Sequence, residues 1–337
     1  MKRLLYLSIS LILFSCGINT LFEPDLTLNY SSKIAFIDRS NSSRYVFIMN
    51  PDGSDKKVIA VSDNRCRDPI WSPDGSKLAY RTNYNLYCVD ITRGHIHKLT
   101  NFSKSINFAT WSPDGSKLAF NTDEIYTINV DGSDLTQLSS NNSSDLHPCW
   151  SPDNKKIYYI SNVNGYREIY VINSDGSENK QLTFDQKSKV NLKLTGDGTK
   201  ILFGCKRNIF VMNSDGSDIR NLTPGLRLDI DYSISPDDSQ IAYVDGGDIW
   251  IMDFDGGKKI NLTSDDNYNS DPKWSPDSNL IVFTVTGYFW LSSISYPDKD
   301  FSYIASIKKD SSELQRLTKK YNKVYHRFYA VWSPFIE

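Results

Sequence analysis

The sequence predicts an all-β fold, a seven-bladed β-propeller of four-stranded antiparallel blades that is closed by the C-terminal strand. Three observations lead to this prediction. One motif recurs about every 40 residues, a second motif recurs between its copies, and the two ends of the chain carry complementary parts of one further repeat.

The first motif is a tryptophan, or another apolar residue, followed by a Ser-Pro-Asp-Gly turn and an apolar run, as in WSPDGSKLAY. Proline presets φ in the turn and glycine accepts a positive φ, so the motif predicts a β-hairpin. Its copies start 39 to 44 residues apart, at Trp71, Trp111, Trp150, Leu194, Ile234 and Trp274.

The second motif is an apolar run, an Asp-Gly turn and a short segment that ends in Leu-Thr or a close variant. Examples are IYTINVDGSDLTQLS from Ile125, IYVINSDGSENKQLT from Ile169, IFVMNSDGSDIRNLT from Ile209 and IWIMDFDGGKKINLT from Ile249. It adds two strands to each unit, and four antiparallel strands in about 40 residues make one propeller blade.

The two ends of the chain supply one blade between them. The first unit matches the repeat from Lys33 onward but lacks the segment that should precede it, and the chain ends with that segment at Tyr329 to Pro334. If this segment is the innermost strand of the first blade, the ring closes with seven complete blades and few exposed edges.

These motifs resemble the Pro-Asp, WD-like repeat of the TolB family, which also occurs in the propellers of prolyl-oligopeptidase-like enzymes. The resemblance covers residues 30–337, which we take as one propeller domain. It implies the fold, whereas function has to be argued from individual sites.

The N-terminal segment has the features of an export signal. Residues 1–15 carry Lys2 and Arg3 before an apolar run that is too short to span a bilayer, which predicts a signal peptide. The next residue, Cys16, follows Leu-Phe-Ser in a sequence that resembles the bacterial lipobox, so residues 16–29 are expected to be a lipidated linker. Gly17 favours the outer membrane, with the propeller facing the periplasm or the cell surface.

Composition excludes some functions. The 38 basic and 40 acidic residues give a net charge of −2 without a basic stripe, so we expect no nucleic-acid partner. Nucleophile-elbow, P-loop and zinc-helix motifs are missing, so we expect no catalytic residue. Irregular spacing predicts buried strand residues rather than a metal site for Cys66, Cys88, Cys149 and Cys205.

Aligning the predicted inner strands on the tryptophan position brings together one residue per blade, three positions earlier. Alternation along a strand would turn this set toward the propeller axis. Its polar members are our candidate site at the channel mouth, which needs no cofactor and can hold a cation or a basic peptide; alternatively, its acids bond backbone amides of the next blade. The full set is Asp68, Phe108, His147, Asn191, Asp231, Asp271 and Tyr329.

The last blade contains a longer stretch than its counterparts, and this stretch is rich in aromatic residues. Such residues suit a protein interface, although part of the run must be a buried strand. The candidate partner loop contains Tyr288, Phe289, Trp290, Tyr296 and Phe301.

Our leading hypothesis is therefore a non-enzymatic, lipid-anchored scaffold that binds a protein or peptide in the cell envelope. One alternative is a propeller enzyme such as an oligogalacturonate-type lyase, in which His147 or His326 would hold manganese. Another alternative is a cell-wall or carbohydrate-binding module, which would use the same aromatic residues.

Overall fold

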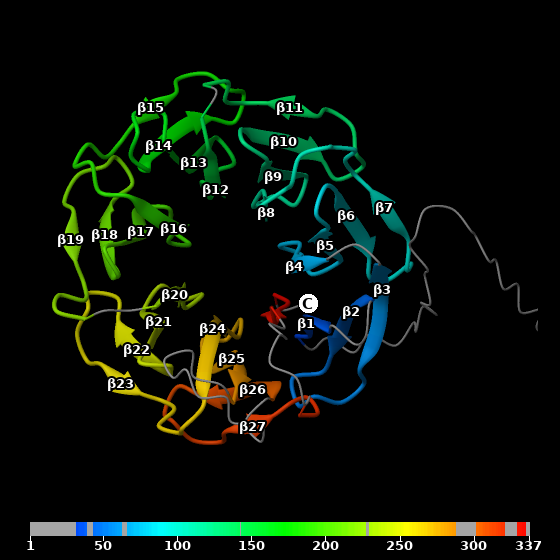
Figure 1. Ribbon diagram of the computed structural model, residues 1–337. Coiled ribbons are helices and arrows are strands. Elements are labelled where there is room, and N and C mark those ends of the chain that lie inside the picture. Colours follow the sequence, from blue (N-terminus) through cyan, green and yellow to red (C-terminus); the bar gives the residue numbers. More distant parts are fainter. Residues whose placement is uncertain are drawn as a thin grey trace, which may run out of the picture.

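The computed structural model describes residues 32–38, 43–62, 66–141, 143–226, 229–287, 301–320 and 329–334. Within these ranges every regular element is a β-strand, and no helix has the length and apolar character that a membrane crossing needs. The strands form seven four-stranded antiparallel sheets around one axis (Figure 1). The predicted seven-bladed propeller is confirmed.

Each sheet is one blade, and its strands follow one another from the axis to the rim. Blade 1 contains β28 (Val331–Trp332), β1 (Ile34–Asp38), β2 (Arg44–Met49) and β3 (Lys57–Ser62); blade 2 contains β4 (Arg67–Trp71), β5 (Lys77–Arg81), β6 (Leu86–Asp90) and β7 (Ile96–Lys98); blade 3 contains β8 (Phe108–Trp111), β9 (Lys117–Asn121), β10 (Ile125–Asn129) and β11 (Thr136–Gln137); blade 4 contains β12 (Asp145–Trp150), β13 (Lys156–Ser161), β14 (Glu168–Asn173) and β15 (Lys180–Gln181).

The last three blades repeat this order. Blade 5 contains β16 (Lys189–Leu194), β17 (Lys200–Cys205), β18 (Asn208–Asn213) and β19 (Arg220–Asn221); blade 6 contains β20 (Asp229–Ile234), β21 (Gln240–Asp245), β22 (Asp248–Asp253) and β23 (Ile260–Asn261); blade 7 contains β24 (Tyr268–Trp274), β25 (Leu280–Thr286), β26 (Ser302–Lys308) and β27 (Gln315–Arg316).

Blade 1 is built from both ends of the chain, as the sequence predicted. Strand β28 pairs antiparallel with β1, with Trp332 opposite Ile34 (Figure 1). Beyond this pair, the Ser333 amide donates to the Lys33 carbonyl and the Lys33 amide donates to Ser333 Oγ, both at 2.7 Å. The Trp332 side chain is buried. The C-terminal strand thereby completes the first blade and closes the ring.

The Ser-Pro-Asp-Gly motif forms the turn between the first two strands of a blade. In blade 2, Ser72 Oγ donates to the Asp74 carboxylate and accepts the Lys77 amide at 2.9 Å. Asp74 also accepts the Ser76 amide at 3.0 Å, and Gly75 has a φ of 68°. The side chains thus bond the turn's own backbone, and glycine supplies the left-handed conformation.

The Leu-Thr ending has a structural role within each blade. In blade 4, the Thr183 hydroxyl accepts the Ile169 amide at 2.9 Å at the start of the third strand. The same bond recurs with Thr100 in blade 2 and Thr223 in blade 5. This repeated bond explains why the Leu-Thr ending recurs, because its hydroxyl satisfies a backbone amide of the third strand.

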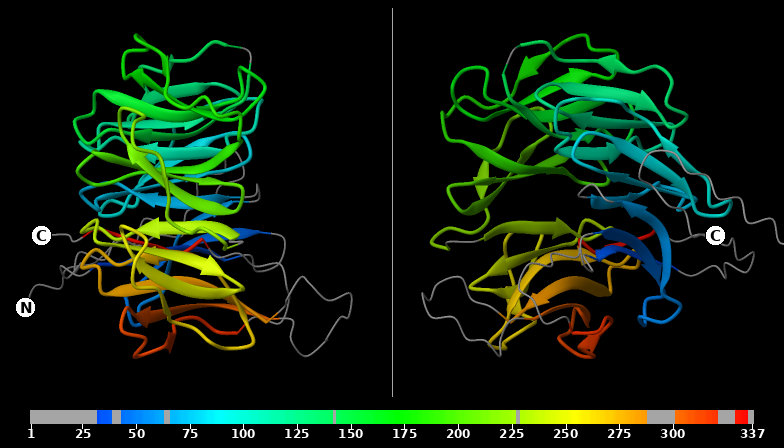
Figure 2. Two further views of the ribbon diagram at one scale, coloured as in Figure 1. Left: turned by 90° about the vertical axis from the view of Figure 1, so that its left-hand side faces the viewer. Right: turned by 45° about the vertical axis from the view of Figure 1, so that its right-hand side comes forward.

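Neighbouring blades are joined by recurrent contacts. The Trp111 indole nitrogen of blade 3 donates to the Ile70 carbonyl of blade 2 at 3.0 Å. At the closure, a side chain on Gly53 of blade 1 would meet the Leu317 carbonyl of blade 7, so this Asp-Gly turn requires glycine for close approach as well as for its φ of 83°. Figure 2 shows the propeller edge-on and in an oblique view.

Candidate functional site

Six of the seven residues aligned in the sequence lie on innermost strands, and Tyr329 lies two residues before β28; we call the seven together the axial ring. The inner strands β4, β8, β12, β16, β20, β24 and β28 surround the centre in Figure 1. Each inner strand also contacts the inner strands of the two neighbouring blades. Equivalent positions therefore lie at one level, and Phe108 and His147 of adjacent blades are in contact.

The axial ring has an unusual backbone. Five of its seven residues have a left-handed φ, with values between 47° and 54°. For residues other than glycine this conformation costs about 1–2 kcal/mol each. The five are Asp68, His147, Asn191, Asp271 and Tyr329.

The left-handed residues coincide with a break in strand pairing. In blade 4 the register between β12 and β13 shifts between Leu146 and Cys149, which marks a β-bulge at His147. From His147 to Trp150 partly exposed and buried residues alternate, but Leu146 and His147 are both partly exposed. The alternation is therefore broken at the bulge, directly before the ring position.

Two of the polar ring residues have clear partners. Asp68 accepts from Arg81 Nε at 2.7 Å, and Arg81 also donates to the Ile106 carbonyl of the next blade at 2.9 Å. The carboxylate of Asp68 is thus neutralised within the fold. His147 lies against Phe108 with 3.7 Å between ring centroids. Burial, together with the charges of Lys193 and Arg167, lowers the pKa of His147 to about 4, so its imidazole is neutral at pH 7.

Two lysines near the ring were not predicted. Lys193 on β16 and Lys273 on β24 occupy the same repeat position, one residue before Leu194 and Trp274. Burial and the Lys273 charge lower the pKa of Lys193 to about 8, while the thiol of Cys149 and the carboxylate of Asp231 act in the opposite direction. The ring region therefore carries both signs of charge. The repeat alignment contained this signal, because the other blades have no charged residue there.

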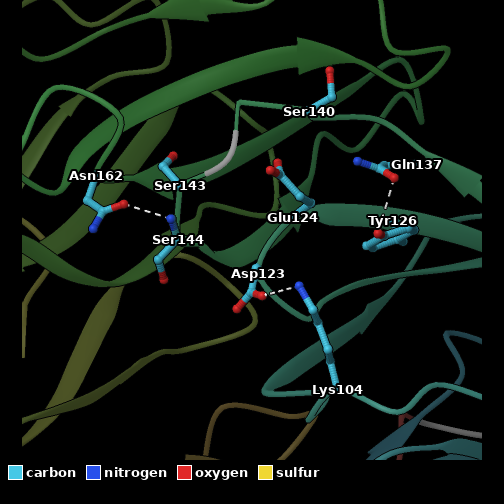
Figure 3. A pocket seen from close by; sticks show the side chains of 9 residues that line it. All are labelled: Lys104, Asp123, Glu124, Tyr126, Gln137, Ser140, Ser143, Ser144 and Asn162. Atoms are coloured by element: carbon cyan, nitrogen blue, oxygen red, sulfur yellow. Dashed lines mark hydrogen bonds and ion pairs between the residues drawn. The ribbon is translucent and has the colours of Figure 1, made fainter.

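A polar pocket of about 720 Å³ lies between blades 3 and 4, away from the axis (Figure 3). At its rim the exposed side chains of Lys104 and Asp123 form an ion pair of 2.6 Å. The buried side chain of Glu124 stands in the centre of the view in Figure 3. The lining residues are Lys104, Asp123, Glu124, Tyr126, Gln137, Ser140, Ser143, Ser144 and Asn162.

A second buried carboxylate, Asp145, lies at the start of β12 and interacts electrostatically with Glu124. Ser139 Oγ donates to Glu124 at 2.8 Å, and Asn141 Nδ2 donates to Asp145 at 3.1 Å. Burial raises the pKa of Asp145, hydrogen bonds from Ser139, Ser161 and Asn141 oppose the rise, and the Glu124 charge adds to it. This pair was not predicted from the sequence, because each acid is unremarkable within its own motif.

Comparison with known proteins decides the family. The model of the TolB beta propeller domain (PD40) matches residues 27–208, which is more than half of the chain. The chain belongs to the TolB β-propeller family. It is 33% identical over 140 residues to a protein TolB homolog of Chlorobium chlorochromatii, covering 39% of this chain and 32% of that protein. The chain therefore matches about a third of the length of this relative.

Solved structures similar to this TolB-like propeller include both TolB and enzymes. TolB from Acinetobacter baumannii has a TM-score of 0.55 at 20% identity, over 90% of this chain and 67% of that one. Oligogalacturonate lyase from Vibrio parahaemolyticus has a TM-score of 0.63 at 14% identity, over 90% and 87%. An oligogalacturonate lyase in complex with manganese has a TM-score of 0.60 at 15% identity, over 85% and 84%. At these identities the likeness concerns the fold alone.

The histidines of the TolB-like propeller are spread over different parts of the blades. His95 and His97 are exposed on and beside β7, the outermost strand of blade 2, whereas His147 lies on the innermost strand of blade 4. His326 lies outside the described residues. Within the described ranges no three His, Cys, Asp or Glu side chains gather in a way that suits a metal ion.

The remaining predicted residues are the strand cysteines, the lipidation cysteine and the aromatic residues of the partner loop. Of the four cysteines predicted to be buried strand residues, Cys88, Cys149 and Cys205 lie on strands, whereas Cys66 directly precedes β4. Cys66, Cys88 and Cys205 are buried and Cys149 is partly buried, and none of the four is in a disulfide within the described residues. Phe301 stacks on Tyr303 at 5.9 Å, and Lys320 Nζ lies 3.6 Å from the Phe301 ring. The other positions lie outside the described residues, namely Cys16, Tyr288, Phe289, Trp290 and Tyr296.

The lowered pKa of His147 predicts a pH-dependent stability. As the pH falls below 6.5, His147 of the unfolded chain binds a proton, whereas His147 of the folded chain binds it only at about pH 4. The free energy of unfolding should therefore decrease by about 3 kcal/mol as the pH falls across this window. His147→Asn cannot titrate and tolerates a left-handed φ, so it should flatten this part of the profile in urea titrations. The matched control, His97→Asn on the exposed rim, should keep the wild-type slope. Equal slopes for the two variants would contradict the assignment.

Proposed function

We propose that this TolB-like propeller is a non-enzymatic scaffold, anchored by lipid at Cys16, that binds a protein or peptide partner of the cell envelope at its axial ring. The observation that carries the proposal is the left-handed backbone at five of the seven ring positions. Strained backbone persists where the surrounding structure enforces it, and bulges that redirect side chains concentrate at functional sites.

The charges of the ring indicate the kind of partner. Asp68 is paired with Arg81, and the other two acids of the ring, Asp231 and Asp271, lie on the neighbouring strands β20 and β24. Lys193 and Lys273 lie two residues further along their strands than the ring position. A peptide segment that presents a basic group to the ring acids and an acidic group to the two lysines would complement both sets of charges.

The family supports a location in the envelope. TolB is a periplasmic protein, and the signal-like residues 1–15 with Cys16 agree with export of this chain. A lyase remains the rival hypothesis because solved propellers of similar shape include oligogalacturonate lyases. Two observations favour the scaffold over a lyase whose histidines hold manganese. His147 lies against Phe108, and His95 and His97 lie at the outer edge of blade 2 rather than beside His147.

The ring proposal is tested by crosslinking in cells, followed by identification of the recovered partners. Asp231→Asn with Asp271→Asn should abolish or strongly reduce recovery of the wild-type partner. The control pair is Asp175→Asn with Asp215→Asn, which makes the same charge change at exposed Asp-Gly turns. Recovery of the same partners at wild-type yield by the ring variant would refute the proposal, as would stoichiometric manganese whose binding requires His147.

The anchor is tested separately. We expect the full-length protein to fractionate with membranes and to incorporate a fatty-acid label, because a diacylated cysteine provides stable membrane binding. Cys16→Ser should abolish the label and move the protein to the soluble fraction, whereas Cys149→Ser should leave both unchanged. Labelling that survives in the Cys16→Ser protein would exclude the proposed anchor.

A further inference from the structure

A small pocket lies at the outer edge of blade 4, beside the outermost strand β15 (Figure 1). It measures about 190 Å³, and we call it the rim pocket. Its lining comes from the loop between β13 and β14, from the start of β14, from β15 and from the loop between β15 and β16. The lining residues are Asn164, Tyr166, Glu168, Gln181, Phe184 and Gln186.

Both loops at the rim pocket depart from the propeller repeat. The loop between the second and third strands comprises residues 162–167 in blade 4, but only residues 206–207 in blade 5 and 246–247 in blade 6. In the other loop, Phe184 directly follows the Leu-Thr ending. The corresponding residues of blades 2, 3, 5, 6 and 7 are not aromatic, namely Asn101, Ser140, Pro224, Ser264 and Lys319. A longer loop and an added aromatic residue therefore meet at this pocket.

The two aromatic side chains of the rim pocket are open to solvent. Phe184 is 71% exposed, the highest value for a large apolar side chain among the described residues, and Tyr166 is 45% exposed. Most phenylalanine side chains are buried, and an exposed one contributes little to the core. Two exposed aromatic rings that line one pocket point to a ligand that covers them, since loops on a rigid scaffold often carry recognition.

Hydrogen bonds fix the amide groups on the polar side of the pocket. Asn164 Nδ2 donates to Gln181 Oε1 at 3.0 Å and to the Tyr170 hydroxyl at 3.1 Å. Gln181 Nε2 donates in turn to the Thr183 carbonyl at 2.6 Å. The orientation of both amides is thus set before a ligand arrives, which lowers the entropy cost of binding.

Two of the lining residues keep polar groups available for a ligand. Among the described residues, Asn164 Oδ1 accepts no hydrogen bond and the side-chain amide of Gln186 makes none. The backbone amide of Gln186 donates to Glu168 Oε1 at 2.7 Å, which holds this residue at the pocket. Gln186 therefore offers a donor and an acceptor, and Asn164 offers an acceptor.

The charges beside the rim pocket are already paired. Glu168 is the only acidic or basic residue of the lining, and Lys189 Nζ lies 2.6 Å from its Oε2. The side chains of Lys189 and Glu168 are 1% and 3% exposed. Lys189 also pairs with Asp185, which Lys187 contacts at 3.4 Å. A charged ligand would find no unpaired counter-charge in the lining, so the pocket favours a neutral ligand.

We propose that the rim pocket binds one neutral sugar ring at the end of a glycan. A pyranose ring has apolar C–H faces, which stack on aromatic rings such as those of Phe184 and Tyr166. Its hydroxyl groups both donate and accept, as Gln186 and Asn164 require. An apolar side chain of a partner would instead cover these amide groups without bonding them, which is unfavourable.

The size of the rim pocket limits the ligand to a single ring. Its volume lies below the range of about 300–1,000 Å³ that is typical of sites for drug-sized molecules. The pocket lies at the outer edge of blade 4, away from the axial ring, so the sugar would be a second ligand beside the proposed protein or peptide partner.

Titrations followed by saturation-transfer NMR test the proposal with the methyl glycosides of glucose, galactose, mannose and N-acetylglucosamine. The full-length protein is kept in a detergent that lacks a sugar head group. We expect at least one glycoside to bind with a dissociation constant in the millimolar range, because so small a ligand makes few contacts. Phe184→Ser, Tyr166→Ser and Gln186→Ala should each weaken this binding at least about fivefold.

The variants include a matched control. Phe184→Ser introduces the residue that blade 3 has at this position, Ser140, so the fold should tolerate it. Tyr84→Ser removes a tyrosine that is 46% exposed from the corresponding loop of blade 2, and this protein should bind the glycoside as the wild type does.

The remaining outcomes would overturn the proposal. These are no millimolar binding of any of the four glycosides, or wild-type affinity in the Phe184→Ser protein. Equal binding of cyclohexylmethanol would show that the hydroxyl groups are not recognised, and tighter binding of methyl glucuronide would exclude a neutral ligand. Tighter binding of acetyl-phenylalanine-amide would replace the sugar with a side chain of a protein partner. The Asp231→Asn, Asp271→Asn protein should bind the glycoside normally, so failure at the axial ring and failure at the rim pocket are distinguishable.

Discussion

The antiparallel pairing of β28 with β1 is the contact on which the rest of the structure depends. Without it, blade 1 would lack its innermost strand, and the core that blades 1 and 7 share would lose Trp332. With it, Trp332 packs with Phe36 of blade 1 and Val282 of blade 7 in one buried cluster. This pairing joins segments that are about as far apart in the sequence as two segments can be, and it closes the circle of blades. Because all seven axial ring residues lie within this circle, closure fixes their relative positions.

Within the closed ring, a small set of bonds is copied from blade to blade. The Asp-Gly turns, the Leu-Thr hydroxyls and the tryptophan nitrogens satisfy backbone groups that the short strands leave unpaired. Because these bonds explain the repeated residues, they carry little information on function. The departures from the repeat carry that information, as at Lys193 and Lys273 beside the ring and at Tyr166 and Phe184 in the rim pocket.

The sequence predicted the architecture because its motifs combine turn chemistry with a fixed period, and the ends of the chain complement each other. It could not predict the bulge at His147, since a bulge breaks the alternation on which the alignment relied. Nor could it pair Asp68 with Arg81, which lies on the adjacent strand, or reveal the pocket at Glu124, because both depend on side chains that meet only in the folded protein.

Ring closure by the C-terminal strand is the central claim, and native-state hydrogen exchange tests it most directly. The Lys33 amide donates to the Ser333 hydroxyl, and the Ser333 amide donates to the Lys33 carbonyl. Both amides should exchange as slowly as strand amides of blade 4, such as that of Ile160 in β13. That result would mean that the clasp opens only when the propeller unfolds. Exchange of both amides within minutes, at the rate of exposed turns, would contradict a closed seven-bladed ring.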